Sequence, residues 1–129
     1  MKKLTLLLWT VGAVQLILGA AYLFAPEAFT AWMKLSPTPN DTNYMFGMLA
    51  ARLIAYGIGM FVIARDPARN LFWINNMILI QLIDLAVGMF YTVNGTVPLS
   101  SSAFPMFNAI LIAGLLFLWR PKQIKNQEK

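Results

Sequence analysis

Two opposite charges, Arg52 and Asp84, lie deep inside long hydrophobic runs. A charged side chain at the centre of a membrane span is costly, faces the protein interior or a water-filled cavity, and marks a functional site by default. An arginine and a carboxylate can also join through two parallel hydrogen bonds. The sequence therefore predicts either a buried ion pair that fixes helix register or a site for a ligand or an ion, and both interpretations stay open.

The hydrophobic runs are long enough to cross a bilayer. Hydrophobic residues make up 59% of the 129 residues and charged residues 12%, unlike the composition of a soluble domain. A span needs about 20 mostly apolar residues. Four segments meet this length: 4–24, 44–64, 71–93 and 102–119. We expect an all-α integral membrane four-helix bundle, with one four-pass domain over 1–129 that ends in a basic cytoplasmic tail at 120–129.

The first hydrophobic run has an alternative interpretation as a signal peptide, because Lys2 and Lys3 precede it and small residues end it. Its length favours an uncleaved helix, since the apolar core of a secretory signal has about 7 to 15 residues.

Lysine and arginine gather on one side of the four-pass layout. That side holds Lys2, Lys3, Arg65, Arg69, Arg120, Lys122, Lys125 and Lys129, whereas the other holds only Lys34. Such residues accumulate on the cytoplasmic side, so both termini are predicted to face the cytoplasm of a bacterial inner membrane. We expect the basic residues to contact anionic lipid headgroups rather than nucleic acid.

The loop at 25–43 should lie on the other, outer side. Pro26 and Glu27 are typical of a helix start, and Phe29, Trp32 and Met33 follow at one-turn spacing. This pattern predicts a short helix in the outer interface, as an aromatic anchor or as a lid over the outer mouth of the bundle.

Depth in the membrane can be counted from the turn that contains Pro67. Arg52 lies fifteen residues before Pro67 and Asp84 seventeen after it. At 1.5 Å per residue, the two charges lie within one helical turn in depth. Other polar side chains at similar depth are expected to complete a polar core or ligand site with this pair: Gln15, Tyr56, Gln81 and Asn108.

Small residues recur every four positions in the second span, at Gly47, Ala51, Ala55 and Gly59. This spacing permits close approach between helices in a membrane. Because the ladder overlaps the stripe that carries Arg52, the sequence predicts that Arg52 points into the bundle.

Cysteine and histidine are both absent, which excludes disulfides, thiol nucleophiles, Cys/His metal sites and histidine-ligated haem. Few groups can exchange protons, so we expect no catalytic residue. The predicted function is non-catalytic: an accessory subunit of a membrane complex, or a binder of an apolar ligand such as a lipid or a quinone. The alternative is a proton- or ion-coupled small transporter or channel that acts as a homo-oligomer.

The passage from Gln15 to Glu27 (QLILGAAYLFAPE), the four-span layout and the Ala64-Arg65-Asp66-Pro67 turn resemble the DoxX-like group of small bacterial membrane proteins. This resemblance implies a four-helix membrane bundle, with some relatives linked to quinone-coupled oxidation complexes. It assigns no functional role to a particular position of this chain.

Overall fold

The computed structural model describes residues 2–122, so residue 1 and most of the predicted basic tail, 123–129, lie outside the described residues. Within 2–122 every regular element is a helix. Four helices are long and apolar enough to cross a membrane: α1 (Lys2–Phe24), α3 (Thr42–Ile63), α4 (Leu71–Val93) and α5 (Leu99–Trp119). The predicted all-helical fold, with four helices long and apolar enough to cross a membrane, is confirmed.

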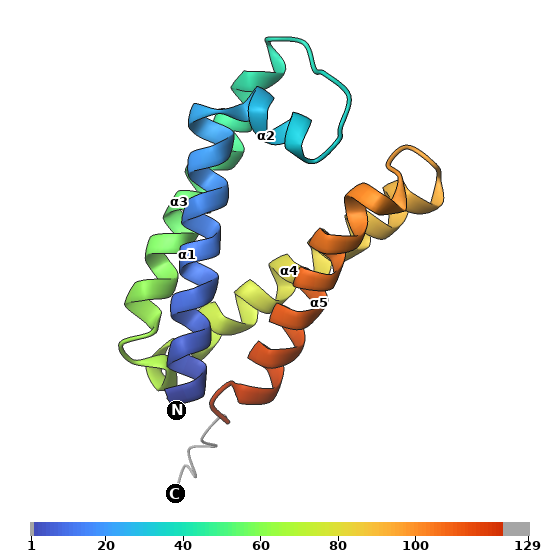
Figure 1. Ribbon diagram of the computed structural model, residues 1–129. Helices are drawn as coiled ribbons and strands as arrows, with labels where there is room; N and C mark the ends of the chain where they lie inside the picture. Colours follow the sequence, from blue (N-terminus) through green and yellow to red (C-terminus); the bar gives the residue numbers. More distant parts are fainter. Residues whose placement is uncertain (1, 123–129) are drawn as a thin grey trace, which may run out of the picture.

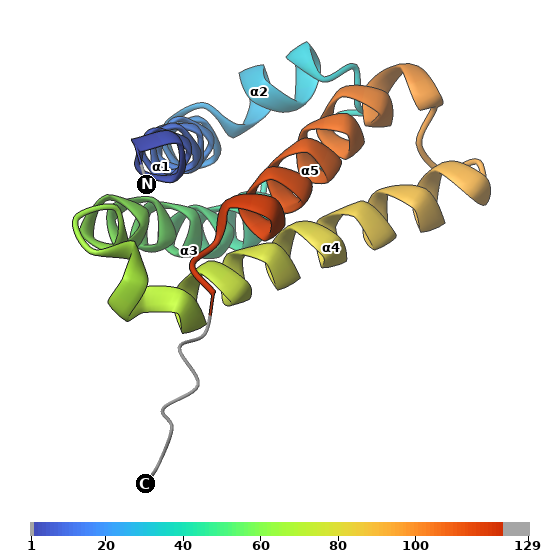
Figure 2. The same ribbon diagram turned by 90° about the horizontal axis from the view of Figure 1, so that it is seen from below.

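The long helices form two antiparallel hairpins (Figure 1). In one hairpin α1 packs along α3, and in the other α4 packs along α5, as the view from the end where α1 begins and α5 ends also shows (Figure 2). We call that end the base; it holds the start of α1, the turn at 64–70 and the end of α5. From the base the two hairpins diverge toward the opposite end, the loop end (Figure 1).

Close contact between α1 and α3 depends on glycines. A Cβ atom built on Gly12 would lie 2.9 Å from the Gly57 carbonyl oxygen, and one built on Gly57 would lie 2.9 Å from the Gly12 carbonyl oxygen. One built on Gly19 would lie 3.2 Å from the carbonyl oxygen of Ala50. The two backbones therefore approach more closely than any larger residue would allow.

The ladder of small residues predicted as a packing face lies on a different side of α3. Atoms built as Cβ on Gly47 and Gly59 would meet nothing within 4 Å, and Ala51 and Ala55 are exposed. The prediction that this face packs inside the bundle is wrong, because Ala50 and Gly57 provide the contact with α1 instead.

The second hairpin is held by a close contact and a hydroxyl pair. A Cβ on Gly88 of α4 would lie 2.8 Å from Cγ of Met106 of α5. Nearer the loop end, the Thr92 hydroxyl donates to Ser102 Oγ at 2.7 Å. Interhelical hydrogen bonds of this kind stabilise membrane helix pairs by about 1 kcal/mol.

The two hairpins are joined at the base by one apolar core to which all four long helices contribute. Its buried members are Leu4, Leu8 and Val11 of α1, Met60, Ile63 and Ala64 at the end of α3, Ile74, Met77 and Ile78 of α4, and Ile112, Ala113 and Leu116 of α5. Every one of these residues lies in the half of its helix that is nearer the base. The base therefore positions the two hairpins relative to each other.

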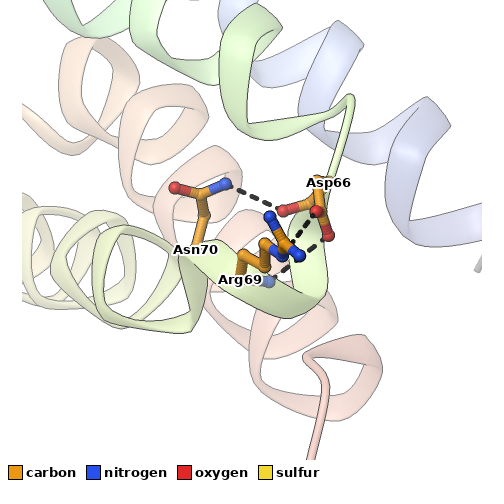
Figure 3. Close-up of polar contacts among 3 residues, drawn as sticks. All are labelled: Asp66, Arg69 and Asn70. Atoms are coloured by element: carbon orange, nitrogen blue, oxygen red, sulfur yellow. Dashed lines mark hydrogen bonds and ion pairs between the residues drawn. The ribbon is translucent and has the colours of Figure 1, made fainter.

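A tight turn fixes how α4 leaves the base. Asp66 precedes the short 3-10 helix η1 (Pro67–Asn70), and its carboxylate pairs with Nε of Arg69 at 3.4 Å (Figure 3). The side-chain amide of Asn70 donates to the Asp66 carbonyl oxygen at 2.8 Å (Figure 3). Pro67 is buried and cannot continue α3 as a helix. The chain therefore reverses here and starts α4 beside α3.

At the loop end, the connection between α1 and α3 contains a short helix, α2 (Pro26–Trp32). Pro26 stands in its first turn, where a missing N–H removes no intrahelical hydrogen bond. The ring of Phe29 lies 4.8 Å from that of Tyr22 in α1, so α2 is attached to the first hairpin.

Candidate functional site: a polar layer above the base

Two buried glutamines lie one helical turn beyond the apolar core of the base. Gln15 stands four residues after Val11 on α1, and Gln81 four residues after Met77 on α4. Their side chains are only 6% and 4% exposed. Asn108 of α5 is half-buried and stands one turn before the core residue Ile112. Because α5 runs toward the base, this also places Asn108 one turn above the core. We call Gln15, Gln81 and Asn108 the polar layer.

The hydrogen-bonding groups of the two glutamines are largely unused. Among residues 2–122, Nε2 of Gln81 donates to the thioether of Met77 at 3.5 Å, and Gln15 has no hydrogen-bond partner. Within the same residues, Oγ of Ser101 is the one fully buried side-chain nitrogen or oxygen atom that has no hydrogen-bond partner. Gln15 and Gln81 are therefore buried residues whose side-chain amides have unused hydrogen-bonding capacity.

Asp84 and Tyr22 continue the same two helix faces toward the loop end. Asp84 is one turn beyond Gln81 on α4, and Tyr22 is two turns beyond Gln15 on α1. Asp84 is exposed, and Tyr22 is half-buried with its ring 5.3 Å from that of Phe46. Above the polar layer, the structure thus places one acid and one phenol.

Arg52 is not part of this arrangement. Its side chain is exposed, and Nη1 donates to the Met48 carbonyl oxygen of the preceding turn at 2.9 Å. In the described part of the chain the one ion pair is that of Asp66 with Arg69. The predicted Arg52–Asp84 ion pair is therefore absent, and the prediction that Arg52 points into the bundle is wrong.

Two features of the fold separate these charges. Arg52 lies five residues from Gly57, about 140° around α3, and so faces away from α1. Asp84 instead follows the face of α4 that carries Met77 and Gln81. In addition, α3 and α4 belong to different hairpins, which diverge from the base toward the loop end (Figure 1). Counting residues gave a similar depth for both charges but not the side of the helix on which each lies.

Tyr56 stands one turn before the core residue Met60 of α3, but its hydroxyl is already paired. Its hydroxyl accepts a weak hydrogen bond from Nδ2 of Asn76 on α4 at 3.5 Å. Tyr56 packs against the base core, so it helps to join α3 to α4. Of the six predicted polar residues, Gln15, Gln81 and Asn108 each stand one turn above the base core and Asp84 follows Gln81 on α4, but within residues 2–122 no hydrogen bond joins these four. Tyr56 pairs with Asn76 instead, and Arg52 faces away from α1.

A further polar contact at the base was not predicted. Nη1 of Arg120 donates to Oδ1 of Asn75 at 2.6 Å, and its guanidinium carbon lies 4.3 Å above the Phe117 ring. This contact ties the end of α5 to the start of α4. A basic residue that directly follows a span was a usable signal, because such side chains commonly reach back to helix ends.

Two shallow hollows lie away from the polar layer. One of about 460 Å³ is bordered by Met89, Phe90 and Val93 near the loop end of α4. The other, of about 410 Å³, lies at the base between Lys2, Lys3 and Trp119. Both are mainly apolar and neither contains an acidic side chain, so the polar layer is the better candidate for recognising a polar group.

The chemistry available at the polar layer is hydrogen bonding. Its three side-chain amides can each donate and accept, and Asp84, one turn above Gln81, can accept a hydrogen bond or attract a cation. Within residues 2–122, no group of three acidic, cysteine or histidine residues could hold a metal ion.

Comparison of the chain with protein-family models, with curated proteins and with solved structures finds no match.

Proposed function

We propose that this chain is a non-catalytic membrane protein that binds an apolar molecule with a hydrogen-bonding head group, a quinone or a lipid, between its two helix hairpins. The observation that carries this proposal is the pair of buried and largely unpaired amides of Gln15 and Gln81. A buried polar group without a partner loses about 1 to 3 kcal/mol, and a ligand head group would recover that loss. The resemblance to the DoxX-like group remains a prediction that agrees with a quinone ligand.

The position of the polar layer supports an amphiphilic ligand. Below it lies the closed apolar core of the base, and above it the hairpins diverge (Figure 1). A head group at the layer would face Gln15 and Gln81, while its tail extends toward the loop end or into the bilayer.

Native mass spectrometry of the purified protein tests this proposal. We expect one quinone or lipid molecule to be retained per chain, and replacement of Gln81 by leucine to weaken its binding at least tenfold, or about 1.4 kcal/mol. The matched control is Thr10→Leu, since Thr10 is an exposed polar residue of a span that donates only within its own helix. Equal retention by both variants would contradict the proposal. Ion flux in liposomes that depends on Asp84 would support a transporter instead.

We further propose that the base faces the cytoplasm of a bacterial inner membrane. Six described basic residues lie at the base (Lys2, Lys3, Arg65, Arg69, Arg120 and Lys122), whereas Lys34 lies near the loop end. The positive-inside rule then orients the chain. In this orientation α2, with Trp32 exposed, lies in the outer interface as an aromatic anchor.

The absence of cysteine makes this orientation directly testable. Single cysteines at the exposed positions Ser100, at the loop end, and Ala68, at the base, give a matched pair. In intact cells stripped of their outer membrane, a membrane-impermeant maleimide should label Ser100→Cys and should label Ala68→Cys only after lysis. The reverse pattern would show the opposite orientation.

A further inference from the structure

The side of α3 that faces away from α1 carries the arginine that the bundle leaves unpaired. We call it the α3 outward face; it consists of Met48, Ala51, Arg52, Ala55 and Gly59. Four of these five residues are exposed, and Gly59 is partly exposed. Arg52 stands ten residues from Thr42 and eleven from Ile63, so it lies about 15 Å from either end of α3. It is therefore a charge near the middle of a span.

The contacts of Arg52 within its own chain are few. One nitrogen donates to the Met48 carbonyl oxygen, and no carboxylate among residues 2–122 pairs with the guanidinium. A charge at this depth is costly without a partner. A guanidinium is satisfied best by a carboxylate that accepts two parallel hydrogen bonds. The missing group is thus an acid at the same depth.

The neighbours of Arg52 leave room for a helix to supply that acid. Ala51 and Ala55 are small, and a methyl group placed on Gly59 would meet nothing within 4 Å. Small side chains let two membrane helices approach until their backbones are in contact. The face therefore combines a shallow helix-binding surface with one charge at its edge.

We propose that the α3 outward face binds a transmembrane helix of a different protein that carries an aspartate or glutamate at mid-membrane depth. Its acid pairs with Arg52, and its small or flat side packs on Ala55 and Gly59. This inference goes beyond ligand binding at the polar layer, because Arg52 and that layer lie on different sides of the structure.

A second copy of this chain fits the face less well than such a partner. A symmetric contact of the face with itself would bring Arg52 of one copy near Arg52 of the other, and like charges repel. The mid-span acid of the chain, Asp84, lies on a different surface, on α4, so a second copy could bring it to Arg52 only in a head-to-tail contact that leaves the same two surfaces open on the end copies. A lipid phosphate is also excluded as the partner, because head groups lie at the ends of the span.

Energy transfer in phosphatidylcholine vesicles tests the inference with a defined probe. The probe is a synthetic transmembrane helix of leucine and alanine with a single central aspartate and an acceptor dye. The chain carries a donor dye at Ala68→Cys, at the base. We expect the aspartate peptide to associate at least tenfold more tightly than the same peptide with asparagine. Arg52→Gln should reduce the affinity for the aspartate peptide to that for the asparagine peptide.

Two further variants show whether the contact uses this face. Ala55→Leu should weaken association at least fivefold, because its larger side chain holds the helices apart. Leu82→Ala, an exposed change on α4, should leave association unchanged. The inference is overturned if Arg52→Gln binds the aspartate peptide with the same affinity as the natural chain does. It is also overturned if Ala55→Leu binds that peptide with undiminished affinity. Transfer between two labelled copies that depends on Arg52 also overturns it, since the face would then be a self-association surface.

Discussion

Replacing Gly57 by leucine is expected to force α1 away from α3 and to lower the free energy of unfolding by about 3 kcal/mol or more. A Cβ at this position would lie 2.9 Å from the Gly12 carbonyl oxygen and 2.8 Å from Cγ of Leu16. The first of these atoms belongs to the backbone of α1, so the clash cannot be relieved by a side-chain rotation. The measurement is unfolding of the purified protein in mixed micelles as the denaturing detergent is increased.

The matched control is Gly59→Leu, two residues later on the same helix. A Cβ on Gly59 meets nothing within 4 Å, and leucine is a better helix former than glycine. Gly59→Leu should therefore keep or slightly raise the stability. Equal stability of the two variants would show that α1 and α3 do not meet through Gly57.

The four spans could be predicted because hydrophobic length alone determines them. The predicted segment 71–93 coincides with α4, and 4–24 and 44–64 differ from α1 and α3 by at most two residues at either end. The largest error is at α5, which begins at Leu99 rather than at 102. Ser100 and Ser101 are polar, which favours a loop. Pro98 is extended, however, and its carbonyl oxygen accepts the backbone N–H of Ser101, which starts the helix at Leu99.

The polar layer could be predicted only in part. The similar depths of Gln15, Gln81 and Asn108 follow from counting residues, since helices have a constant rise. The side of α3 that carries Arg52 could not be obtained in this way, because two sets of small residues compete on that helix. Every-fourth spacing favours the ladder from Gly47 to Gly59, whereas the contact with α1 uses Ala50 and Gly57.

A signal for the correct face was present in the sequence of both helices. Gly12 and Gly19 are seven residues apart on α1, and Ala50 and Gly57 are seven residues apart on α3. In an antiparallel pair, equal spacing brings Gly12 opposite Gly57 and Gly19 opposite Ala50, as the structure shows. A ladder of small residues on one helix indicates a contact only when a neighbouring helix carries small residues at the same spacing. None of the other described helices has glycines at the positions that would match Gly47 and Gly59.

Separation of the hairpins is the expected consequence of weakening the base. Leu116 of α5 is fully buried in the core to which all four long helices contribute. Replacing it by alanine removes three carbon atoms where the hairpins meet and should lower the free energy of unfolding by about 2 to 5 kcal/mol. Leu118→Ala is the matched control, because Leu118 is 73% exposed on the same helix.

Replacing Leu116 should also weaken ligand binding at the polar layer, because the core of the base joins α1, which carries Gln15, to α4, which carries Gln81. Retention of a quinone or lipid by Leu116→Ala should therefore fall together with stability, whereas Leu118→Ala should keep both. Full stability of Leu116→Ala would contradict a base that joins the hairpins. Reduced stability with undiminished retention would place the ligand outside the space between the hairpins, because a site built from both must lose affinity when they part.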